Sequence, residues 1–222
     1  MFKQKAFTLA EVLVTLGIIG VVSAMTVPTL MQNYQKKSYV TQLHKVYNQL
    51  SQAIAQYQTD KNALNLKEAG LNSTDAADNF FKAYFKIVQD CGDNFIPCFA
   101  DVSEYKYLNG TNSSPDTRGK HIVLADGTSL RYEFKNNLGL VVIELFVDIN
   151  GAKGPNIVGR DMFAIYVYNN GSIDDWAAGN TLSGLTVDQR NKSFTEVCSG
   201  ATSGNWYGCF GKLLNDNWEM TY

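Results

Sequence analysis

The sequence predicts an α+β protein in which one long N-terminal helix packs against an antiparallel β-sheet. The first observation is an apolar stretch from Phe7 to Met31, followed by a helical stripe of apolar residues that reaches about Thr59. The second is a change, from His121 onward, to short apolar runs separated by turn residues. A chain of 222 residues is long enough for one such domain and an anchor.

The stretch from Phe7 to Met31 has the length of a membrane-spanning helix. It holds about 25 residues, which is enough to cross a bilayer, and Glu11 is its one charged residue. Lys3 and Lys5 precede it, and positive residues before an apolar helix hold the N-terminus in the cytoplasm. We therefore expect everything after Met31 to lie outside the cytoplasmic membrane.

Glu11 requires an explanation, because a carboxylate costs about 2.5–3.5 kcal/mol at the centre of a transmembrane helix. It lies one turn after Phe7, where the cost is smaller and the helix dipole favours an anion. An anion at this depth can pair with a cation in the membrane. A free α-amino group made by cutting the chain near Phe7 is the best candidate for that cation.

The residues around this position resemble a known family. Lys5 to Leu13 reads KAFTLAEVL, which is similar to the prepilin cleavage and methylation motif of type IV pilins and type II secretion pseudopilins. The resemblance implies that a prepilin peptidase cuts between Ala6 and Phe7 and methylates the new amine. It also implies that Glu11 is needed for filament assembly. Ala6 stands where the family usually has Gly, and because both are small we expect cleavage.

The resemblance also implies a domain organisation and partners. Residues 1–6 would be a leader, 7–31 a transmembrane and filament-core helix, and 32–222 an extracytoplasmic pilin head. Gly20 and Pro28 fall where pilin helices carry a Gly and a Pro, and we expect a helix kink there. The expected partners are identical or related pilin subunits, prepilin peptidase and an inner-membrane assembly platform.

The implied function is that of a structural subunit of a type IV pilus or a type II secretion pseudopilus. Such a chain is first held in the bacterial cytoplasmic membrane and then assembled into a periplasmic or cell-surface filament. A minor pilin whose head binds a ligand, such as DNA or a host surface, is the alternative. Two other interpretations of the N-terminus stay open: a plain uncleaved anchor, and a secretory signal peptide cut after Val22-Ser23-Ala24.

After the membrane stretch, we expect the helix to continue to about Thr59, for a total length of roughly 80 Å. Polar residues fill its other face, so the head must cover the apolar stripe. The residues of this stripe are Tyr39, Val40, Leu43, Val46, Tyr47, Leu50, Ile54 and Tyr57.

A second helix is predicted after a connection over residues 60–72. Ser73, Thr74 or Asp75 can cap it, and we expect it to end near Asp90. It would carry a mostly aromatic cluster, Phe80, Phe81, Tyr84, Phe85 and Val88.

Four strands are predicted beyond a polar, exposed loop over residues 107–119. Asp126-Gly127 is the signal of a two-residue hairpin turn between the first two strands. Asn136-Asn137 turns the chain again, and Asn169-Asn170-Gly171 closes the fourth strand. These short connections favour an antiparallel meander. The predicted strands are 121–125, 129–134, 140–147 and 162–168.

Four cysteines follow the predicted anchor, which suits an oxidising compartment. Their CX6C and CX10C spacings do not match zinc sites, and neither of the two histidines, His44 and His121, flanks a cysteine. Three connectivities are open, and we expect the one that closes the smallest loops, each bridge contributing about 2–3 kcal/mol. The expected pairs are Cys91–Cys98 and Cys198–Cys209. A disulfide-closed C-terminal region also resembles many pilins, and short helices are predicted there around 188–198 and 210–214.

The stretch between the third and fourth strands holds oxygen-bearing side chains of the kind that bind calcium. It departs from the EF-hand pattern, because Gly151 comes two positions early and Gly159 stands where the bidentate Glu belongs. The family offers a precedent, since some major pseudopilins carry a calcium loop. A rigid turn in which the side chains satisfy the backbone is the other interpretation, and both stay open. The candidate residues are Asp148, Asn150, Asn156 and Asp161.

The sequence predicts neither an enzyme nor a nucleic-acid-binding protein. It contains no nucleophile elbow and no phosphate-binding glycine loop, and the acids Asp174-Asp175 have no matched catalytic partner. A net charge of −2 gives no general basic surface for nucleic acid. We expect no cofactor.

Overall fold

The structure is a computed structural model that describes residues 8–136, 140–179, 183–200 and 206–222. The chain divides into two compact units, residues 1–38 and 39–222, which we call the N-terminal unit and the C-terminal unit. Helix α1 (Leu9–Asp60) contributes residues to both units.

The N-terminal unit is helical from Leu9 onward. Every residue from Thr8 to Gln35 is exposed. The α-helix continues through Gly20 and Pro28 without a break. The kink expected at these two positions stays a prediction.

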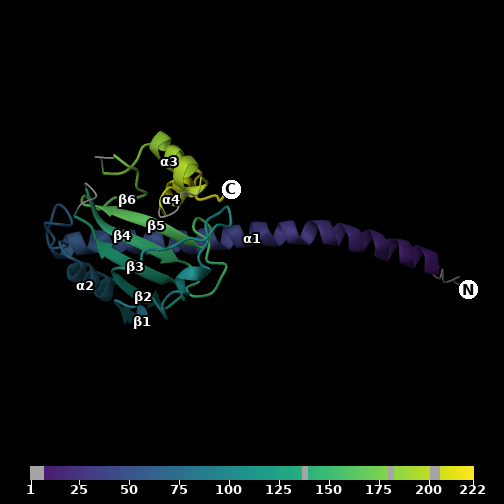
Figure 1. Cartoon of the computed structure of the whole chain (residues 1–222), viewed down its shortest axis with the longest axis horizontal. Helices are drawn as coiled ribbons and strands as arrows, with labels where there is room; N and C mark the ends of the chain where they lie inside the picture. Colours follow the sequence, from purple (N-terminus) through teal and green to yellow (C-terminus); the bar gives the residue numbers. More distant parts are fainter. Residues whose placement is uncertain (1–7, 137–139, 180–182, 201–205) are drawn as a thin grey trace, which may run out of the picture. The chain divides into compact units, whose positions relative to one another are not determined.

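The C-terminal unit is built on a six-stranded antiparallel sheet in which each strand pairs with the next in sequence (Figure 1). This order confirms the predicted meander, and the long helix with its sheet confirms the α+β class. Asn169-Asn170-Gly171 turns the chain after the fourth predicted strand, as expected, and the short strand β6 that follows this turn was not predicted. The strands are β1 (Ile87–Gly92), β2 (Lys120–Leu124), β3 (Ser129–Phe134), β4 (Val141–Asp148), β5 (Met162–Tyr168) and β6 (Ile173–Asp174).

One face of the sheet packs against the C-terminal half of α1. The predicted apolar stripe of the helix is buried there, with Tyr39 and Tyr47 at its margins half-buried. Each large apolar side chain buried in this way contributes about 1.5–3 kcal/mol. The strand residues of this face alternate along the sequence and are paired across the ladder, namely Ile122 with Leu130, Leu130 with Val147, Tyr132 with Leu145, and Leu145 with Ile165.

Helix α2 (Thr74–Tyr84) begins where predicted but ends earlier. Ser73 caps it, and its hydroxyl accepts from the Ala76 N–H over 3.0 Å. The predicted end near Asp90 is wrong, because Phe85 is already extended and the residues after it form β1. Pairing of β1 with β2 satisfies backbone groups that a longer helix would have used. It also adds an edge strand, which the helical spacing of these residues did not predict.

The β2–β3 hairpin also differs from the prediction in its turn. Val123 pairs with Ser129, and the Leu124 N–H donates to Thr128 O over 2.8 Å, so the loop is longer than two residues. Gly127 takes the left-handed conformation, with φ at +90°. This is the geometry of a three-residue hairpin with a glycine bulge, which shares its Asp-Gly sequence signal with the tighter turn.

The second face of the sheet is also covered, which explains why all of β4 is buried. The segment that follows β1, including the 3-10 turn η1 (Val102–Glu104), crosses this face, and the rings of Phe95 and Phe99 lie edge-on to His121. Residues 107–119 are largely exposed as predicted. Tyr107, Ser113 and Pro115 are the buried exceptions.

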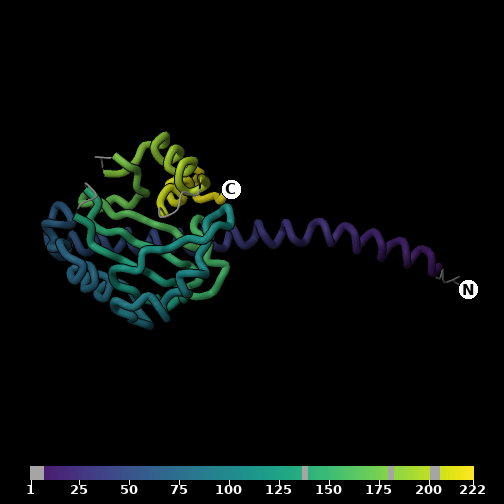
Figure 2. The backbone as a smooth tube through the Cα atoms, viewed as in Figure 1, coloured from purple at the N-terminus to yellow at the C-terminus, as the bar shows by residue number. Residues whose placement is uncertain are grey.

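The C-terminal segment forms the predicted short helices. These are α3 (Val187–Ser193), a π-helical turn η2 (Phe194–Cys198) and α4 (Cys209–Asn215), which lies beside β5 (Figure 2). After α4 the chain returns to α1, where the Trp218 ring stacks on His44 with ring centroids 4.1 Å apart. The end of the chain therefore packs on the same helix that begins the C-terminal unit.

Candidate functional site

Glu11 is held at the first turn of α1. The backbone N–H and the hydroxyl of Thr8 both donate to Glu11 Oε2 over 2.8 Å, and the Glu11 N–H donates to Thr8 Oγ1 over 3.2 Å. This reciprocal arrangement is a capping box, which satisfies backbone donors at the start of a helix. It fixes the carboxylate at the end of the helix where the dipole favours an anion. Ala6 and Phe7, the predicted cleavage residues, lie outside the described part of the chain.

The surface of the N-terminal unit is apolar as well as exposed. Its large apolar side chains range in exposure from 41% at Val12 to 77% at Leu9. An 18-residue window of α1 has a mean hydropathy of 2.0, and this helix is long and apolar enough to cross a membrane. So large an apolar surface marks a site of contact with a membrane or with other helices.

Both local cysteine pairs are disulfides in the C-terminal unit. Cys91, in β1, is joined to Cys98 as predicted, with their Cα atoms 6.2 Å apart. Cys198, at the end of η2, is joined to Cys209, the first residue of α4, with Cα atoms 5.2 Å apart. No cysteine is left free for metal binding or exchange.

The β4–β5 loop is packed against both disulfide-closed segments through two glycines. A Cβ at Gly151 would lie 3.0 Å from Ser129 Oγ, whose hydroxyl donates to Cys98 O. A Cβ at Gly159 would lie 2.6 Å from Cys209 Sγ. Both glycines have a positive φ, at +64° and +86°, which a residue with a side chain rarely adopts. The two glycines that break the EF-hand pattern therefore allow the loop to pack closely against its neighbours.

The ends of this loop bring the four candidate calcium ligands together. Asp148 ends β4, and the Ile149 N–H donates to Asp161 O over 2.9 Å. The Asp161 carboxylate accepts from the Asn156 N–H over 2.8 Å and from the Ile157 N–H over 2.6 Å. The side chain of Asp161 therefore shapes the turn, which is the role expected for a rigid Asx turn.

Three oxygen atoms of the same loop are buried without a hydrogen-bond partner among the described residues. An unsatisfied buried polar group costs about 1–3 kcal/mol, so each one requires a reason. The three atoms are Asp148 Oδ1, Asn150 Oδ1 and Asn156 Oδ1.

The electrostatics of the loop also indicate that its polar groups lack partners. Burial raises the pKa of Asp148 well above its ordinary value; the Tyr105 hydroxyl acts against this shift, and the neighbouring Asp161 adds to it. Burial also raises the pKa of Asp161, against the backbone N–H groups that it accepts. Neither carboxylate has an ion-pair partner among the described cations. Two neighbouring buried carboxylates thus lack a positive counter-charge.

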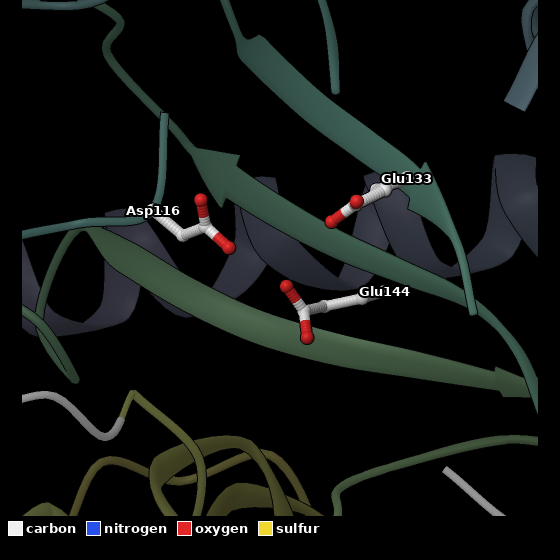
Figure 3. Close-up of side chains that lie close together, drawn as sticks. All are labelled: Asp116, Glu133 and Glu144. Carbon is white, nitrogen blue, oxygen red and sulfur yellow. The ribbon is translucent and has the colours of Figure 1, made fainter. Parts of the chain in front are cut away.

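A second carboxylate cluster has its counter-charge in place. Asp116, Glu133 and Glu144 point toward one another from the loop, β3 and β4 (Figure 3). Arg131, which is fully buried, lies 3.2 Å from Asp116, 2.7 Å from Glu133 and 2.5 Å from Glu144. Arg118 and Lys135 add two more cations, so three carboxylates face three cations. This cluster is a satisfied ionic network between the sheet and its covering loop.

Parts of the chain are similar to a known family and to curated proteins. Residues 1–27 match the family described as the prokaryotic N-terminal methylation motif. The chain is 34% identical over 79 residues, 36% of its length, to prepilin peptidase-dependent protein D of Escherichia coli strain K12, covering 49% of that protein. It is 32% identical over 72 residues, 32% of its length, to type II secretion system core protein G of Pectobacterium carotovorum subsp. carotovorum, covering 46% of that protein. No solved structure matches the chain.

These findings define the class of protein. The chain has the methylation motif, an apolar N-terminal helix and a pilin-like α+β arrangement. In these features it resembles pilins and pseudopilins, so the predicted resemblance is confirmed. It spans slightly less than half the length of the curated relatives that it matches.

Sequence reasoning missed two residues that the structure brings into these sites. Thr8 could have been found, because Thr8-x-x-Glu11 is the pattern of a capping box. Tyr105 left no such signal, because it reaches Asp148 across 43 positions of sequence.

Proposed function

We propose that this chain is a structural subunit of a type IV pilus or a type II secretion pseudopilus that polymerises through its N-terminal helix. The observation that carries the proposal is the Glu11 carboxylate, held by Thr8 at the start of an exposed apolar helix within the methylation motif. A soluble protein would not keep such a surface uncovered.

The assembly step follows from charge and hydrophobicity. Cutting between Ala6 and Phe7 would create a positive amine one turn before Glu11, and a neighbouring subunit's Phe7 amine would pair with the Glu11 carboxylate. Contact between apolar helices would bury the exposed side chains, while the ion pair would set their register. Removing one partner of such a poorly solvated pair costs about 3–5 kcal/mol.

The names of the relatives support the proposed partners. One relative is described as dependent on prepilin peptidase and the other as a type II secretion core protein. We extend both relationships to this chain: processing by prepilin peptidase, addition at an inner-membrane assembly platform, and contact with identical or related subunits. The C-terminal unit would lie outside the cytoplasmic membrane.

Intact-mass measurement of the chain in membrane fractions tests the processing step. We expect a mature N-terminus at Phe7 carrying a methyl group. A control with Ala6→Leu, which places a bulky residue before the cut, should accumulate as precursor. A start at Met25 would instead establish a signal peptide, and an intact Met1 in the unaltered chain would establish a plain anchor.

We also propose that the β4–β5 loop binds a divalent cation of the calcium type. Asp148, Asn150, Asn156 and Asp161 would supply oxygen ligands, which calcium prefers. The support is the set of three unsatisfied buried oxygens beside two carboxylates without a counter-charge. A bound cation would supply that charge and satisfy those oxygens.

Thermal unfolding of the full chain in detergent, with calcium or with a chelator, tests the cation site. We expect calcium to raise the Tm, because a ligand at 100 times its Kd stabilises the folded state by about 2.7 kcal/mol. Asp148→Asn should abolish the response. Asp116→Asn, which alters a carboxylate of the satisfied network, should keep it. An unaltered chain with the same Tm in millimolar calcium and in chelator would contradict the proposal.

A further inference from the structure

Tyr105 connects a distant segment to the β4–β5 loop. Its ring is fully buried, and its hydroxyl donates to Asp148 Oδ2 over 2.7 Å. The Tyr105 carbonyl accepts from the Ser113 N–H over 2.8 Å, which fixes the backbone from the other side. The Tyr105 backbone is therefore tied to a segment outside the β4–β5 loop.

The residue after Tyr105 pairs with the second half of the same loop. The Lys106 N–H donates to Asn156 O, and the Val158 N–H donates to Lys106 O, each over 2.9 Å. One dipeptide thus contacts Asp148 through a side chain and the Asn156 region through its backbone. Asp148 and Asn156 are two of the three residues of this loop that have an unsatisfied side-chain oxygen.

The chemistry of the phenol distinguishes Asp148 from other carboxylates of the C-terminal unit. Asp174 is bonded to Arg190 over 2.8 Å, and Asp126 to Lys45 over 2.7 Å, so a cation neutralises each. The Tyr105 hydroxyl is a neutral donor, which orients the Asp148 carboxyl group without supplying a counter-charge. It occupies Oδ2 and leaves Oδ1, the unsatisfied atom, available as a ligand.

We infer that Tyr105 is a positioning residue for the cation site, holding Asp148 so that Oδ1 is presented to the ion. This inference rests on the proposed cation site of the β4–β5 loop. Partners of ligating carboxylates act in this way in metal sites, and their loss typically weakens binding about 10–100-fold.

Calorimetric titration of the full chain in detergent with Ca²⁺ tests the inference. Tyr105→Phe removes one oxygen atom, and we expect it to weaken Ca²⁺ binding by about 10–100-fold. The matched control is Tyr132→Phe. Tyr132 is also fully buried and donates to Asp78 over 2.7 Å, but it lies on the face of the sheet that packs against α1. This control should keep the affinity of the unaltered chain.

A double variant separates positioning from general stability. If Tyr105 acts through Asp148, Tyr105→Phe should change Ca²⁺ affinity no further once Asp148→Asn is present. Unchanged Ca²⁺ binding by a folded Tyr105→Phe chain would overturn the inference while leaving the cation site intact. Absence of Ca²⁺ binding by the unaltered chain would overturn both.

Amide hydrogen exchange on the unaltered chain covers the case in which Tyr105→Phe does not fold. Saturation with Ca²⁺ should slow exchange at Lys106 and Ser113, whose N–H groups tie the Tyr105 segment to its surroundings. The Gly127 N–H, in the β2–β3 turn, should change less. Equal exchange at Lys106 and Ser113 with and without bound Ca²⁺ would overturn the inference.

Discussion

Gly159 lies so close to Cys209 that a Cβ at this glycine would sit 2.6 Å from the cysteine sulfur. Contacts under about 3 Å are not tolerated between a carbon and a neighbouring heavy atom, and close-packed interiors have no room to relax. The β4–β5 loop and the second disulfide therefore fit together only because residue 159 has no side chain.

This contact predicts that Gly159→Ala destabilises the C-terminal unit. Gly127→Ala is the matched control, because Gly127 has a similar φ of +90° but nothing within 4 Å of its added Cβ. Both variants carry the strain of a left-handed alanine, and only Gly159→Ala adds a clash. We expect Gly159→Ala to lose about 1–3 kcal/mol more free energy of unfolding, measured by denaturant titration under oxidising conditions. Equal losses would show that the loop relaxes away from the disulfide.

The buried ionic network predicts a large effect at Arg131. Arg131→Met leaves the carboxylates of Asp116, Glu133 and Glu144 without their shared cation, and breaking a buried ion pair from one side costs about 3–5 kcal/mol. The control is Arg118→Met, whose side chain is 74% exposed although it also contacts Asp116. It should cost at most about 1 kcal/mol.

Denaturant titration of both arginine variants at neutral pH provides the measurement. A loss at Arg131 no larger than that at Arg118 would mean that solvent reaches the network. The three carboxylates would then be ordinary surface acids.

Asp175 predicts a pH dependence with a defined direction. Burial raises its pKa to about 6, although the N–H groups of Gly208, Gly211 and Trp176 all donate to it. Because the folded pKa lies above the unfolded value of about 3.9, this group stabilises the fold below about pH 4. That contribution is lost as the pH rises through 6, by up to about 3 kcal/mol.

Unfolding free energies measured between pH 4 and pH 7 check this direction. The difference between the unaltered chain and Asp175→Asn should change across that window and level off above it. A constant difference would mean that Asp175 titrates at its ordinary pKa in the folded state.

Glu11 predicts a loss of assembly without a loss of folding. Glu11→Ala removes the carboxylate that Thr8 holds at the start of α1, in the N-terminal unit. We expect precursor level, cleavage after Ala6 and thermal unfolding of the C-terminal unit to stay near normal, while filaments disappear. Blotting and microscopy of sheared fractions at matched expression give the readout.

Glu104→Ala is the control for charge, because it removes an exposed acid from the C-terminal unit. It should leave filament yield unchanged. Normal filaments in a strain whose only copy carries Glu11→Ala would remove the main support for assembly through this carboxylate.

The regular elements of this protein are encoded locally, and the sequence determined them. The apolar stripe from Val40 to Tyr57 repeats at helical spacing, and that stripe is buried along α1. Short apolar runs between turn residues predicted β2 to β5 and their meander. The N-terminal motif around Glu11 is likewise a local pattern, which is why a short stretch of sequence is enough to indicate the class of protein.

Tertiary structure decided what local patterns cannot express. The stretch after Tyr84 has helical spacing but becomes β1, because pairing with β2 satisfies its backbone. Arg131 lies in a strand where a buried cation is costly, and only carboxylates from three separate elements explain its burial.

The oxygen-rich loop could be seen in the sequence as a calcium candidate or a rigid turn. Its unsatisfied atoms, the Tyr105 hydroxyl and the packing of Gly159 on Cys209 depend on residues far apart in the chain. Spacing within one segment records how that segment buries its own side chains, whereas a contact requires both partners to be placed in space.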